Sequence, residues 1–399
     1  MVSIKRTFLT LCLALIAIAG FAQNEAAWKA LEKPLNFYLV NDLGRNGYYD
    51  QKPIAELLGK MAEAVDIECV VAAGDVHHFE GVRSVDDPLW MTNYELIYSH
   101  PELMIPWYTI MGNHEYRGNT QAPIDYTRKS ARWNMPDRYY TKVLENDGIT
   151  IRLVMIDTPP LLDKYREDTE KYPDACKQDM NKQLAWIDSV LSTAKEDWVL
   201  VVGHHPIYAD TEKEESERMD MEKRVDSILR KYKNVDMYLC GHIHNFQHIR
   251  KNGSNIDYVV NTSGSLSRKV KPVDGTKFCS GETGFSLISA DKKELNLHMI
   301  NKEGKVIYTE NIRSDSGASF YSLKIKGICQ DRLGRYPLLI GEYLVRYIFC
   351  FCQLELAFLK DFSLLPYFYI LLYTKNHIMN KKNTLNNGYC SFFSNFAQF

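Results

Sequence analysis

The 399-residue sequence has no excess of charge of either sign. Forty-eight Lys and Arg side chains stand against 50 Asp and Glu side chains, which gives a formal net charge of −2 at pH 7. Nucleic-acid-binding domains usually carry a strongly basic stripe, so we do not expect a nucleic acid partner. Apolar residues make up 45% of the chain and charged residues 25%, which is ordinary for a soluble globular protein.

The nine cysteines form no disulfide framework that their spacing reveals. Four of them lie in the C-terminal tail, and Cys69, Cys176, Cys240 and Cys279 are scattered singly through the central part of the chain. Cys69 and Cys240 lie in apolar, strand-like runs. We therefore expect these two to be small buried side chains rather than ligands.

No apolar run is long enough to span a bilayer, which takes about 20 residues. The run 8–19 follows Lys5 and Arg6, and small residues come after it. This pattern predicts a secretory signal peptide over residues 1–22, and not a membrane anchor. The mature protein would then be exported, periplasmic or secreted, with no stable membrane span.

The C-terminal stretch 313–399 differs in composition from the rest of the chain. It is rich in Phe, Tyr, Leu, Ile, Asn and Lys, contains no Trp, and has an apolar segment at 362–373 that is too short for a transmembrane helix. We expect this atypical tail not to belong to the fold. The alternative is a membrane-associating or partner-binding appendage.

Residues 23–312 alternate between strand-like and helical patterns and then run through several strands in succession. This order predicts an α/β (α+β) domain with two mixed sheets packed face to face and flanked by helices. Helices are expected at 53–64, 88–98, 179–194 and 214–231, and strands at 35–40, 70–73, 107–111, 139–143, 149–156, 198–202 and 235–240. The last strands, expected at 258–260, 285–289, 295–300 and 306–310, would belong to the second sheet.

Metal-type ligands follow five separate apolar runs. In open parallel sheets such strand ends meet at the carboxyl edge, where ligands bind. Four of the five sites come directly after Gly, whose missing Cβ permits a sharp turn and a close approach of the backbone to an ion. The candidates are Asp42, Asp75, Asn113, His204, and the pair His242 and His244.

The spacing of these groups favours two metal ions over one. On an extended segment, the i, i+2 pair His242 and His244 would place both rings on one face, about 6–7 Å apart. Carboxylate, amide and imidazole ligands suit Fe, Mn or Zn. Two such ions about 3.5–4 Å apart stabilise the attacking and leaving oxygens of an in-line displacement at phosphorus.

The ordered motifs resemble the calcineurin-like metallophosphoesterase superfamily, and within it the small purple acid phosphatases of the tartrate-resistant type. The resemblance spans about residues 35–312 and implies a four-layer β-sandwich. The matching segments are Asp42, Gly74-Asp75, Gly112-Asn113-His114-Glu115, Gly203-His204 and Gly241-His242-Ile243-His244.

By resemblance, Asp75 would bridge two metal ions. The first ion would be held by Asp42, Asp75, His78 and His244, and the second by Asp75, Asn113, His204 and His242. His114 would steady the phosphate and protonate the leaving oxygen, which requires the cationic imidazole and favours acidic to neutral pH. His205, next to a ligand, is a further candidate for substrate binding.

Three positions depart from the family pattern. His78 replaces the tyrosinate that gives ferric members their purple colour, so we predict a colourless enzyme with divalent ions or a mixed pair; His77 is the alternative ligand. Lys213 replaces a second substrate-side histidine; it could attract phosphate, although we favour a solvated side chain. Met221 replaces a cysteine that pairs with the equivalent of Cys240 in mammalian members.

The sequence thus predicts an exported dinuclear metallophosphatase that hydrolyses small phosphomonoesters by attack of a metal-activated hydroxide. The same site could instead act on phosphodiesters or pyrophosphates, because the motifs do not fix the leaving group. A catalytically silent phosphate- or partner-binding protein on this fold is the third reading. The loss of the tyrosinate leaves it open.

Overall fold

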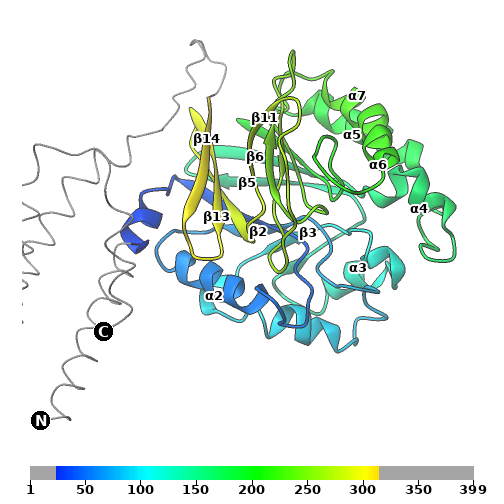
Figure 1. Cartoon of the computed structure of the whole chain (residues 1–399), viewed down its shortest axis with the longest axis horizontal. Coiled ribbons are helices and arrows are strands. Elements are labelled where there is room, and N and C mark those ends of the chain that lie inside the picture. Colours follow the sequence, from blue (N-terminus) through cyan, green and yellow to red (C-terminus); the bar gives the residue numbers. More distant parts are fainter. Residues whose placement is uncertain (1–23, 314–399) are drawn as a thin grey trace, which may run out of the picture. The chain divides into compact units, whose positions relative to one another are not determined.

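The computed structural model describes residues 24–313. The predicted signal peptide (1–22) and the tail lie outside the described residues, apart from Arg313 at the end of the last strand. Within the described part of the chain, no helix combines the length and the hydropathy that a membrane crossing needs. Two seven-stranded sheets with flanking helices make up this part (Figure 1), as the sequence predicted.

The first sheet combines a parallel part with an antiparallel part. β1 pairs in parallel with β2, β2 with β3 and β3 with β4, whereas β12, β13 and β14 continue the sheet on the other side of β1 with antiparallel pairing. The strand order is β14 (Val306–Arg313), β13 (Glu294–Asn301), β12 (Gly284–Ala290), β1 (Leu35–Val40), β2 (Cys69–Ala72), β3 (Trp107–Thr109) and β4 (Trp133–Asn134).

The second sheet also combines parallel and antiparallel pairing. Its four central strands, β10, β8, β7 and β6, are parallel, and antiparallel strands close both edges. The order is β11 (Thr276–Ser280), β9 (Phe246–Ile249), β10 (Asp257–Val260), β8 (Met237–Cys240), β7 (Trp198–Val202), β6 (Ile149–Met155) and β5 (Tyr140–Asn146). β7 and β8 are buried along their whole length, as strands covered on both faces are.

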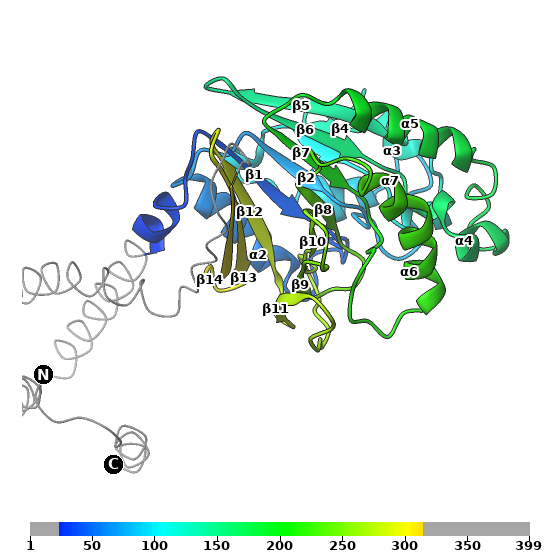
Figure 2. The ribbon, with the colours of Figure 1, turned by 90° about the horizontal axis from the view of Figure 1, so that it is seen from above.

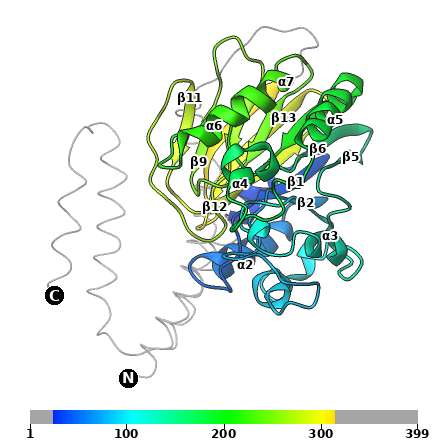
Figure 3. The ribbon, with the colours of Figure 1, turned by 90° about the vertical axis from the view of Figure 1, so that its right-hand side faces the viewer.

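Helices cover the sheets from both sides. The first sheet carries α2 (Gln51–Ala62), and α4 (Asp163–Glu167), α5 (Met180–Thr193), α6 (Glu215–Met221) and α7 (Ser227–Leu229) gather on the side of the second sheet (Figures 2 and 3). The hydroxyl of Tyr38 on β1 donates to the Leu58 carbonyl of α2. The Asp179 side chain caps α5 by accepting from the backbone of Lys182 at 3.0 Å. A short α3 (Ala122–Tyr126) lies between the two groups in the sequence.

Two of the expected helices contain π-helical turns. The segment expected at 88–98 forms one such turn, Trp90–Glu95. The segment expected at 214–231 is continuous but changes from α6 through a π-helical turn at Glu222–Asp226 to α7. Single 3₁₀ turns occupy Pro101–Leu103, Glu115–Arg117 and Pro159–Leu161.

The predicted assignment of the last strands to one second sheet is wrong. Only β10 joins β8 in the second sheet, while β12, β13 and β14 return to the first sheet and pair beside β1. Alternating patterns identify strands but not their neighbours, because pairing is decided by packing between distant segments. The same limit hid β9 and β11, which the sequence did not predict.

One continuous apolar core joins the two sheets. Cys69 and Cys240 are fully buried within it, as predicted, and the cysteines at 176 and 279 are also unpaired among the described residues. Met221, at the position of the missing family cysteine, is buried as well. The two sheets therefore hold together by apolar packing, which fixes the relative position of the loops at their carboxyl ends.

Candidate metal centre

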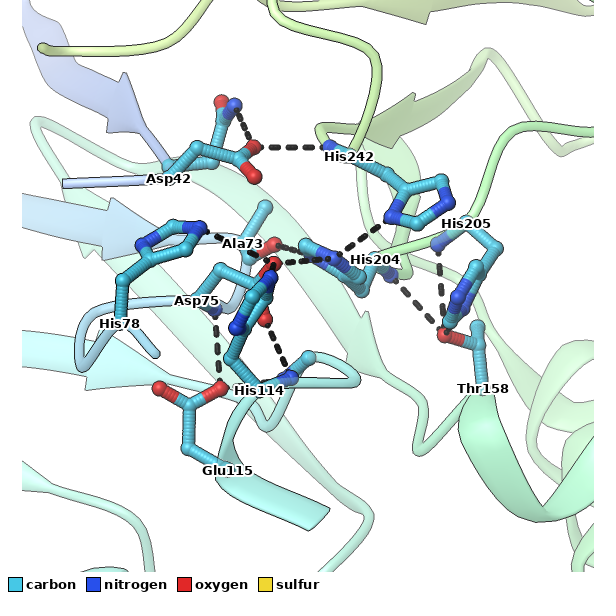
Figure 4. A network of polar contacts seen from close by, with 12 residues as sticks. Asp42, Ala73, Asp75, His78, His114, Glu115, Thr158, His204, His205 and His242 are labelled. Carbon is cyan, nitrogen blue, oxygen red and sulfur yellow. Dashed lines mark hydrogen bonds and ion pairs between the residues drawn. The ribbon is translucent and has the colours of Figure 1, made fainter. Parts of the chain in front are cut away.

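Loops from both sheets converge on one polar centre (Figure 4). The loops after β1, β2 and β3 come from the first sheet, and the loops after β7 and β8 come from the second. Hydrogen bonds join the two groups: His204 Nδ1 lies 2.8 Å from the Ala73 carbonyl oxygen, and the backbone N–H of His242 donates to Asp42 Oδ2 at 2.8 Å. Residues 200 positions apart in the sequence thus share one site.

Asp75 lies at the middle of this centre. One of its oxygens, Oδ2, is 3.2 Å from His204 Nε2, 3.6 Å from His78 Nε2 and 3.8 Å from His114 Nε2. The other oxygen, Oδ1, accepts the backbone N–H of His114 at 2.9 Å. A single carboxylate therefore faces imidazoles from both sheets, which is the position that a bridging ligand requires.

Asp42 forms the second carboxylate of the centre. Its Oδ1 is 3.0 Å from His244 Nε2, and its Oδ2 accepts from the Asn41 side chain at 2.7 Å. Both Asp42 and Asp75 have left-handed backbone conformations, with φ of 52° and 53°. Such angles are uncommon outside glycine and occur often at functional sites.

The charges of the centre depend on one another. Burial alone would raise the pKa values of Asp75 and Asp42, but nearby histidines, His204 and His244 foremost, lower both below their usual range. Burial would likewise lower the pKa of His204, yet the negative charge of Asp75 raises it to about 9. The carboxylates are thus kept ionised and ready to bind cations.

The imidazoles of the second sheet are oriented through their outer nitrogens. Because a carbonyl oxygen can only accept, His204 Nδ1–H donates to Ala73, and Nε2 is left to face Asp75. His242 Nε2–H donates to Glu217 Oε2 at 3.1 Å, so Nδ1 points toward His204 Nε2 at 3.2 Å. A carboxylate or carbonyl behind the ring is the usual way in which proteins orient a metal-binding histidine.

Several buried polar atoms of the centre have no hydrogen-bond partner among the described residues. They are Asn113 Oδ1, both ring nitrogens of His78, and His244 Nδ1. An unpaired buried acceptor costs free energy, about 1–3 kcal/mol. Lone pairs of this kind beside two carboxylates fit metal cations as the missing partners.

Four sets of ligand atoms lie close enough together to hold an ion. Within each set, all of the atoms are within 4.8 Å of one another. The sets are His204, His205 and His242; Asp42, His78 and His244; Asp75, His78 and His114; and Asp42, Asp75 and His204. They share members, so they form one continuous cluster of candidate ligands.

The backbone geometry expected for the histidine pair is wrong, although both rings reach the centre. His242 and His244 lie in the loop after β8 with φ of 70° and 64°, not on an extended segment. Their rings diverge, so that one faces His204 and Glu217 while the other faces Asp42. The turn gives each ring its own partner, which a flat strand would not do.

His77 lies away from the centre. Its ring is fully buried and packs against Trp90 at a centroid distance of 4.4 Å, and Trp133 lies 6.2 Å away. Burial lowers its pKa to about 3, which is the behaviour of a neutral core residue. Of the two adjacent histidines, His78 is the one that faces Asp75.

The two substrate-binding candidates differ in what they can reach. His205 is fully buried, and both ring nitrogens have protein partners: Nδ1 lies 2.8 Å from Thr158 Oγ1 and Nε2 lies 2.9 Å from the Tyr165 hydroxyl. This arrangement leaves no nitrogen for a substrate. Lys213 is half-buried, and burial and the positive charge of Arg268 lower its pKa.

Lys213 also feels the negative charges of Glu217, Asp75 and Asp42, which act to raise its pKa. The side chain is half-buried, and not fully solvated as we favoured from the sequence. No hydrogen bond or ion pair engages the ammonium within the described residues.

His114 stands at the accessible side of the centre. Its Nδ1–H donates to the Phe79 carbonyl at 2.7 Å, and 14% of its side chain is exposed. The other nitrogen, Nε2, faces Asp75. Burial lowers the pKa of His114, while the charge of Asp75 acts in the opposite direction.

Two supporting carboxylates were not predicted. Glu217 binds His242 from α6, and it aligns with Met221 and Val225 on the apolar stripe of the helix, where an acidic residue is unusual. Glu115 accepts the backbone N–H groups of Asp75 at 3.0 Å, Gly112 at 2.8 Å and His77 at 2.9 Å. Burial and the charge of Asp75 raise the pKa of Glu115 to about 7.

Glycine is required where these loops touch. Gly74 has φ of +87°, and a Cβ there would lie 2.6 Å from His204 Nδ1. A Cβ on Gly112 would collide with the Asp75 carboxylate. The predicted need for close backbone approach is therefore met at these two positions.

The fold and the centre define a class of hydrolase in which two mixed sheets place carboxylate, amide and imidazole ligands around one polar site. Residues 35–246 match the calcineurin-like phosphoesterase family, more than half of the chain. The chain belongs to this family, and it is a metallophosphoesterase.

Curated relatives include purple and tartrate-resistant acid phosphatases. Purple acid phosphatase 4 of Arabidopsis thaliana is 28% identical over 330 residues, covering 78% of this chain and 95% of the relative. Tartrate-resistant acid phosphatase type 5 of Rattus norvegicus is 30% identical over 276 residues, covering 65% of this chain and 82% of the relative.

Among solved structures, GAP50, the anchor in the inner membrane complex of Plasmodium, shares the fold with a TM-score of 0.60 and 22% identity, covering 71% of this chain and 89% of that one.

Proposed function

We propose that the chain is a dinuclear metal-dependent phosphatase that hydrolyses phosphomonoesters. The observation that carries the proposal is the position of Asp75, whose carboxylate faces imidazoles from both sheets within 3.2–3.8 Å. We assign each cation to one set of four residues. The first cation would be held by Asp42, Asp75, His78 and His244. The second would be held by Asp75, Asn113, His204 and His242.

Bound cations of this type lower the pKa of water and neutralise charge on a phosphoryl group. The protein supplies the rest by position. Glu115 holds the backbone of Asp75 and Ala73 holds the ring of His204, two groups that would face the cations. Lys213 adds an unpaired positive charge near the centre, which suits a dianionic monoester better than a singly charged diester.

His114 is placed to protonate the leaving oxygen. Its Nδ1–H is committed to the Phe79 carbonyl, so a proton can leave only from Nε2, which faces the centre. Nε2 carries that proton when the ring is cationic. Because burial lowers the pKa of His114, the cation is best populated at acidic pH, and we infer an acidic optimum for activity.

We infer the charge of the metals from His78. A neutral imidazole stabilises a trivalent ion less than a phenolate does, so we infer a colourless protein with divalent Fe, Mn or Zn, or a mixed pair. Export from the cell, inferred from the N-terminal pattern, remains a prediction.

The test is a side-by-side assay of 4-nitrophenyl phosphate and bis(4-nitrophenyl) phosphate, with Mn²⁺, Zn²⁺ and Fe²⁺ added separately to the chelator-treated full chain. We expect the monoester to be hydrolysed faster, with two metal ions bound per chain and no visible absorption band. Faster cleavage of the diester would assign the site to phosphodiesters. No turnover with any metal would leave a binding protein on this fold.

A further inference from the structure

A cavity of about 460 Å³ opens beside the metal centre. His78 belongs to both: it faces Asp75 on one side and lines this cavity on the other. The other walls include Arg45, Tyr48 and Tyr49 from the loop after β1, and Phe79 from the loop after β2. The cavity is therefore next to the place where a substrate phosphate would sit.

All of the exposed aromatic side chains among residues 24–313 line this one cavity. Tyr48 is 72% exposed, Tyr49 is 66% exposed and Phe79 is 62% exposed. The other aromatic side chains of the described part of the chain are at least half-buried. Such clustering beside a reactive centre is unexpected for surface residues that serve only solubility, and it is typical of a ligand pocket.

The loop that carries the two tyrosines is held in a fixed shape. The Gln51 side chain accepts the backbone N–H of Gly47 at 2.7 Å and reaches the Asn93 carbonyl at 3.0 Å. The Asn93 side chain in turn accepts the backbone N–H of Asn46 at 2.6 Å. Exposed rings on a braced loop can bind a ligand without the cost of ordering it first.

The conformation of Tyr49 also needs a reason. Its φ is 54°, a left-handed angle that costs a bulky residue free energy. The residue gains little burial in return, since 66% of it is exposed. The strained residue thus presents its ring to the cavity instead of to the core.

Arg45 provides a buried cation in the same cavity. Its guanidinium lies over the Phe79 ring at 4.8 Å, and only 9% of the residue is exposed. Nε has no hydrogen-bond partner among the described residues. The guanidinium plane and the aromatic rings together offer stacking surfaces with one cationic face.

We propose that this cavity binds the leaving group of the substrate, and that it selects phosphomonoesters whose alcohol part carries a planar aromatic ring. The proposal rests on the proposed function, because the phosphate must occupy the neighbouring metal centre. Phe79 connects the two sites: its carbonyl fixes His114, and its ring lies 6.1 Å from that of His114. The proton donor and the aromatic wall are thus adjacent.

Binding of two phosphonates to the metal-loaded full chain tests the proposal without turnover. Phenylphosphonate and methylphosphonate present the same phosphorus group, but only the first has a ring. From the usual strength of aromatic pairs, we expect wild type to prefer phenylphosphonate by about tenfold in titration calorimetry. Equal affinity for the two ligands would overturn the subsite while leaving the metal centre intact.

Three variants test which side chains cause the preference for phenylphosphonate. Tyr48→Ala and Phe79→Ala remove exposed rings, and Tyr49→Asn removes a ring while keeping a residue that tolerates the left-handed backbone. Each should lower the phenyl-to-methyl preference by about threefold. Met104→Ala, which trims another exposed apolar side chain (53% exposed) outside the cavity, is the matched control and should keep the preference. An unchanged preference in all three variants would contradict the proposal.

A hydrolysis assay distinguishes a small aryl group from a nucleobase as the ring that the cavity binds. It compares 4-nitrophenyl phosphate and adenosine 5′-monophosphate, each with glycerol 3-phosphate. A larger kcat/KM for either aromatic ester that falls in the Tyr48→Ala variant supports the subsite and identifies a small aryl group or a nucleobase as its occupant. If neither phosphonate binds, the proposed metal centre fails, and the subsite fails with it.

Discussion

The two sheets contribute different chemistry to the centre. The loops after the parallel strands of the first sheet carry all of the proposed oxygen ligands, Asp42, Asp75 and Asn113, and also His78. The loops after β7 and β8 of the second sheet carry proposed imidazole ligands alone. Asp42 and Asp75 accept backbone N–H groups and have left-handed backbone conformations, whereas Asn113 Oδ1 has no hydrogen-bond partner among the described residues. The imidazoles are held from behind by oxygen atoms, such as the Ala73 carbonyl and the Glu217 carboxylate.

The loops of each sheet form one half of the centre, and each half orients a proposed ligand of the other half. Ala73 at the end of the first-sheet strand fixes the His204 ring, and the backbone of His242 in the second sheet fixes the Asp42 carboxylate. The comparison predicts that losing different ligands has unequal effects, because only Asp75 belongs to both of the proposed ligand sets.

The largest effect is expected at Asp75. Asp75→Asn keeps the shape and the acceptor for the His114 backbone but removes the shared charge, so neither cation is held well. Activity should fall by at least about 10³-fold, since several kcal/mol of charge stabilisation are lost. Metal analysis should find no tightly bound ion, whereas His204→Ala should keep one.

Asp157→Asn is the matched control for that variant. Asp157 also follows a buried strand, but burial raises its pKa to about 7, so it carries less charge to lose, and its partner is the Tyr116 hydroxyl at 2.5 Å. Equal loss of metal in both variants would show that any buried carboxylate here is needed for folding, and that Asp75 has no special role.

A smaller effect is expected at His114, which belongs to neither set of ligands. His114→Asn removes the proton donor but leaves the metals in place. We expect kcat to fall by about 10²-fold or more, with metal content unchanged. Esters with good leaving groups, such as 4-nitrophenyl phosphate, should lose less than alkyl esters. A uniform loss across leaving groups would argue against proton donation.

Glu217 tests the support behind the imidazole half. Glu217→Gln weakens the acceptor for His242 Nε2–H, and second-layer changes of this kind cost about 10–100-fold in metal affinity. Glu214→Gln, which removes a more exposed carboxylate that also pairs with Lys164, is the control. A zinc-buffered competition measures the affinity of each variant, and identical values for the two would show that Glu217 does not support the site.

Local sequence patterns predicted the strand ends well. Asp42, Asp75 and His204 each follow an apolar run that the structure shows as a buried strand, and Gly74 marks a turn that needs φ above zero. Such signals are local, since a strand, its end and the residue after it are neighbours in the chain. The resemblance to a family then placed these ends at one site.

Features that depend on distant packing could not be predicted. Glu217 had a signal in its place on an apolar helical stripe, but its partner His242 is known only once α6 packs beside the loop after β8. The return of β12 to β1 left no local trace. Likewise, nothing near Tyr48 in the sequence indicates Phe79 as its neighbour in one cavity.

The smallest expected effect concerns the charge that links the two halves in the metal-free protein. The pKa of His204 rises from 6.5 to about 9 beside Asp75, so the pair contributes stability fully below pH 6.5 and loses it as the pH rises through about 9. The raised pKa values of Glu115 and Asp157, both about 7, act in the same direction but at lower pH. Measurements from pH 7.5 to 9.5 lie above these two transitions. Burial also raises the pKa values of the Cys69 and Cys240 thiols, which lowers stability at the upper end of this range, so the contribution of His204 is obtained by comparison with Asp75→Asn.

In that range, the melting temperature of the chelator-treated protein should fall by a few degrees, because each pKa unit is worth about 1.4 kcal/mol and a domain of this size shifts by about 2–4 °C per kcal/mol. The metal-loaded protein should show no such fall, since a histidine ligand is already deprotonated. Calorimetry of chelator-treated wild type and Asp75→Asn across this pH range measures the two slopes of melting temperature against pH. A slope as steep in the variant as in wild type would mean that the linking charge is not the His204–Asp75 pair.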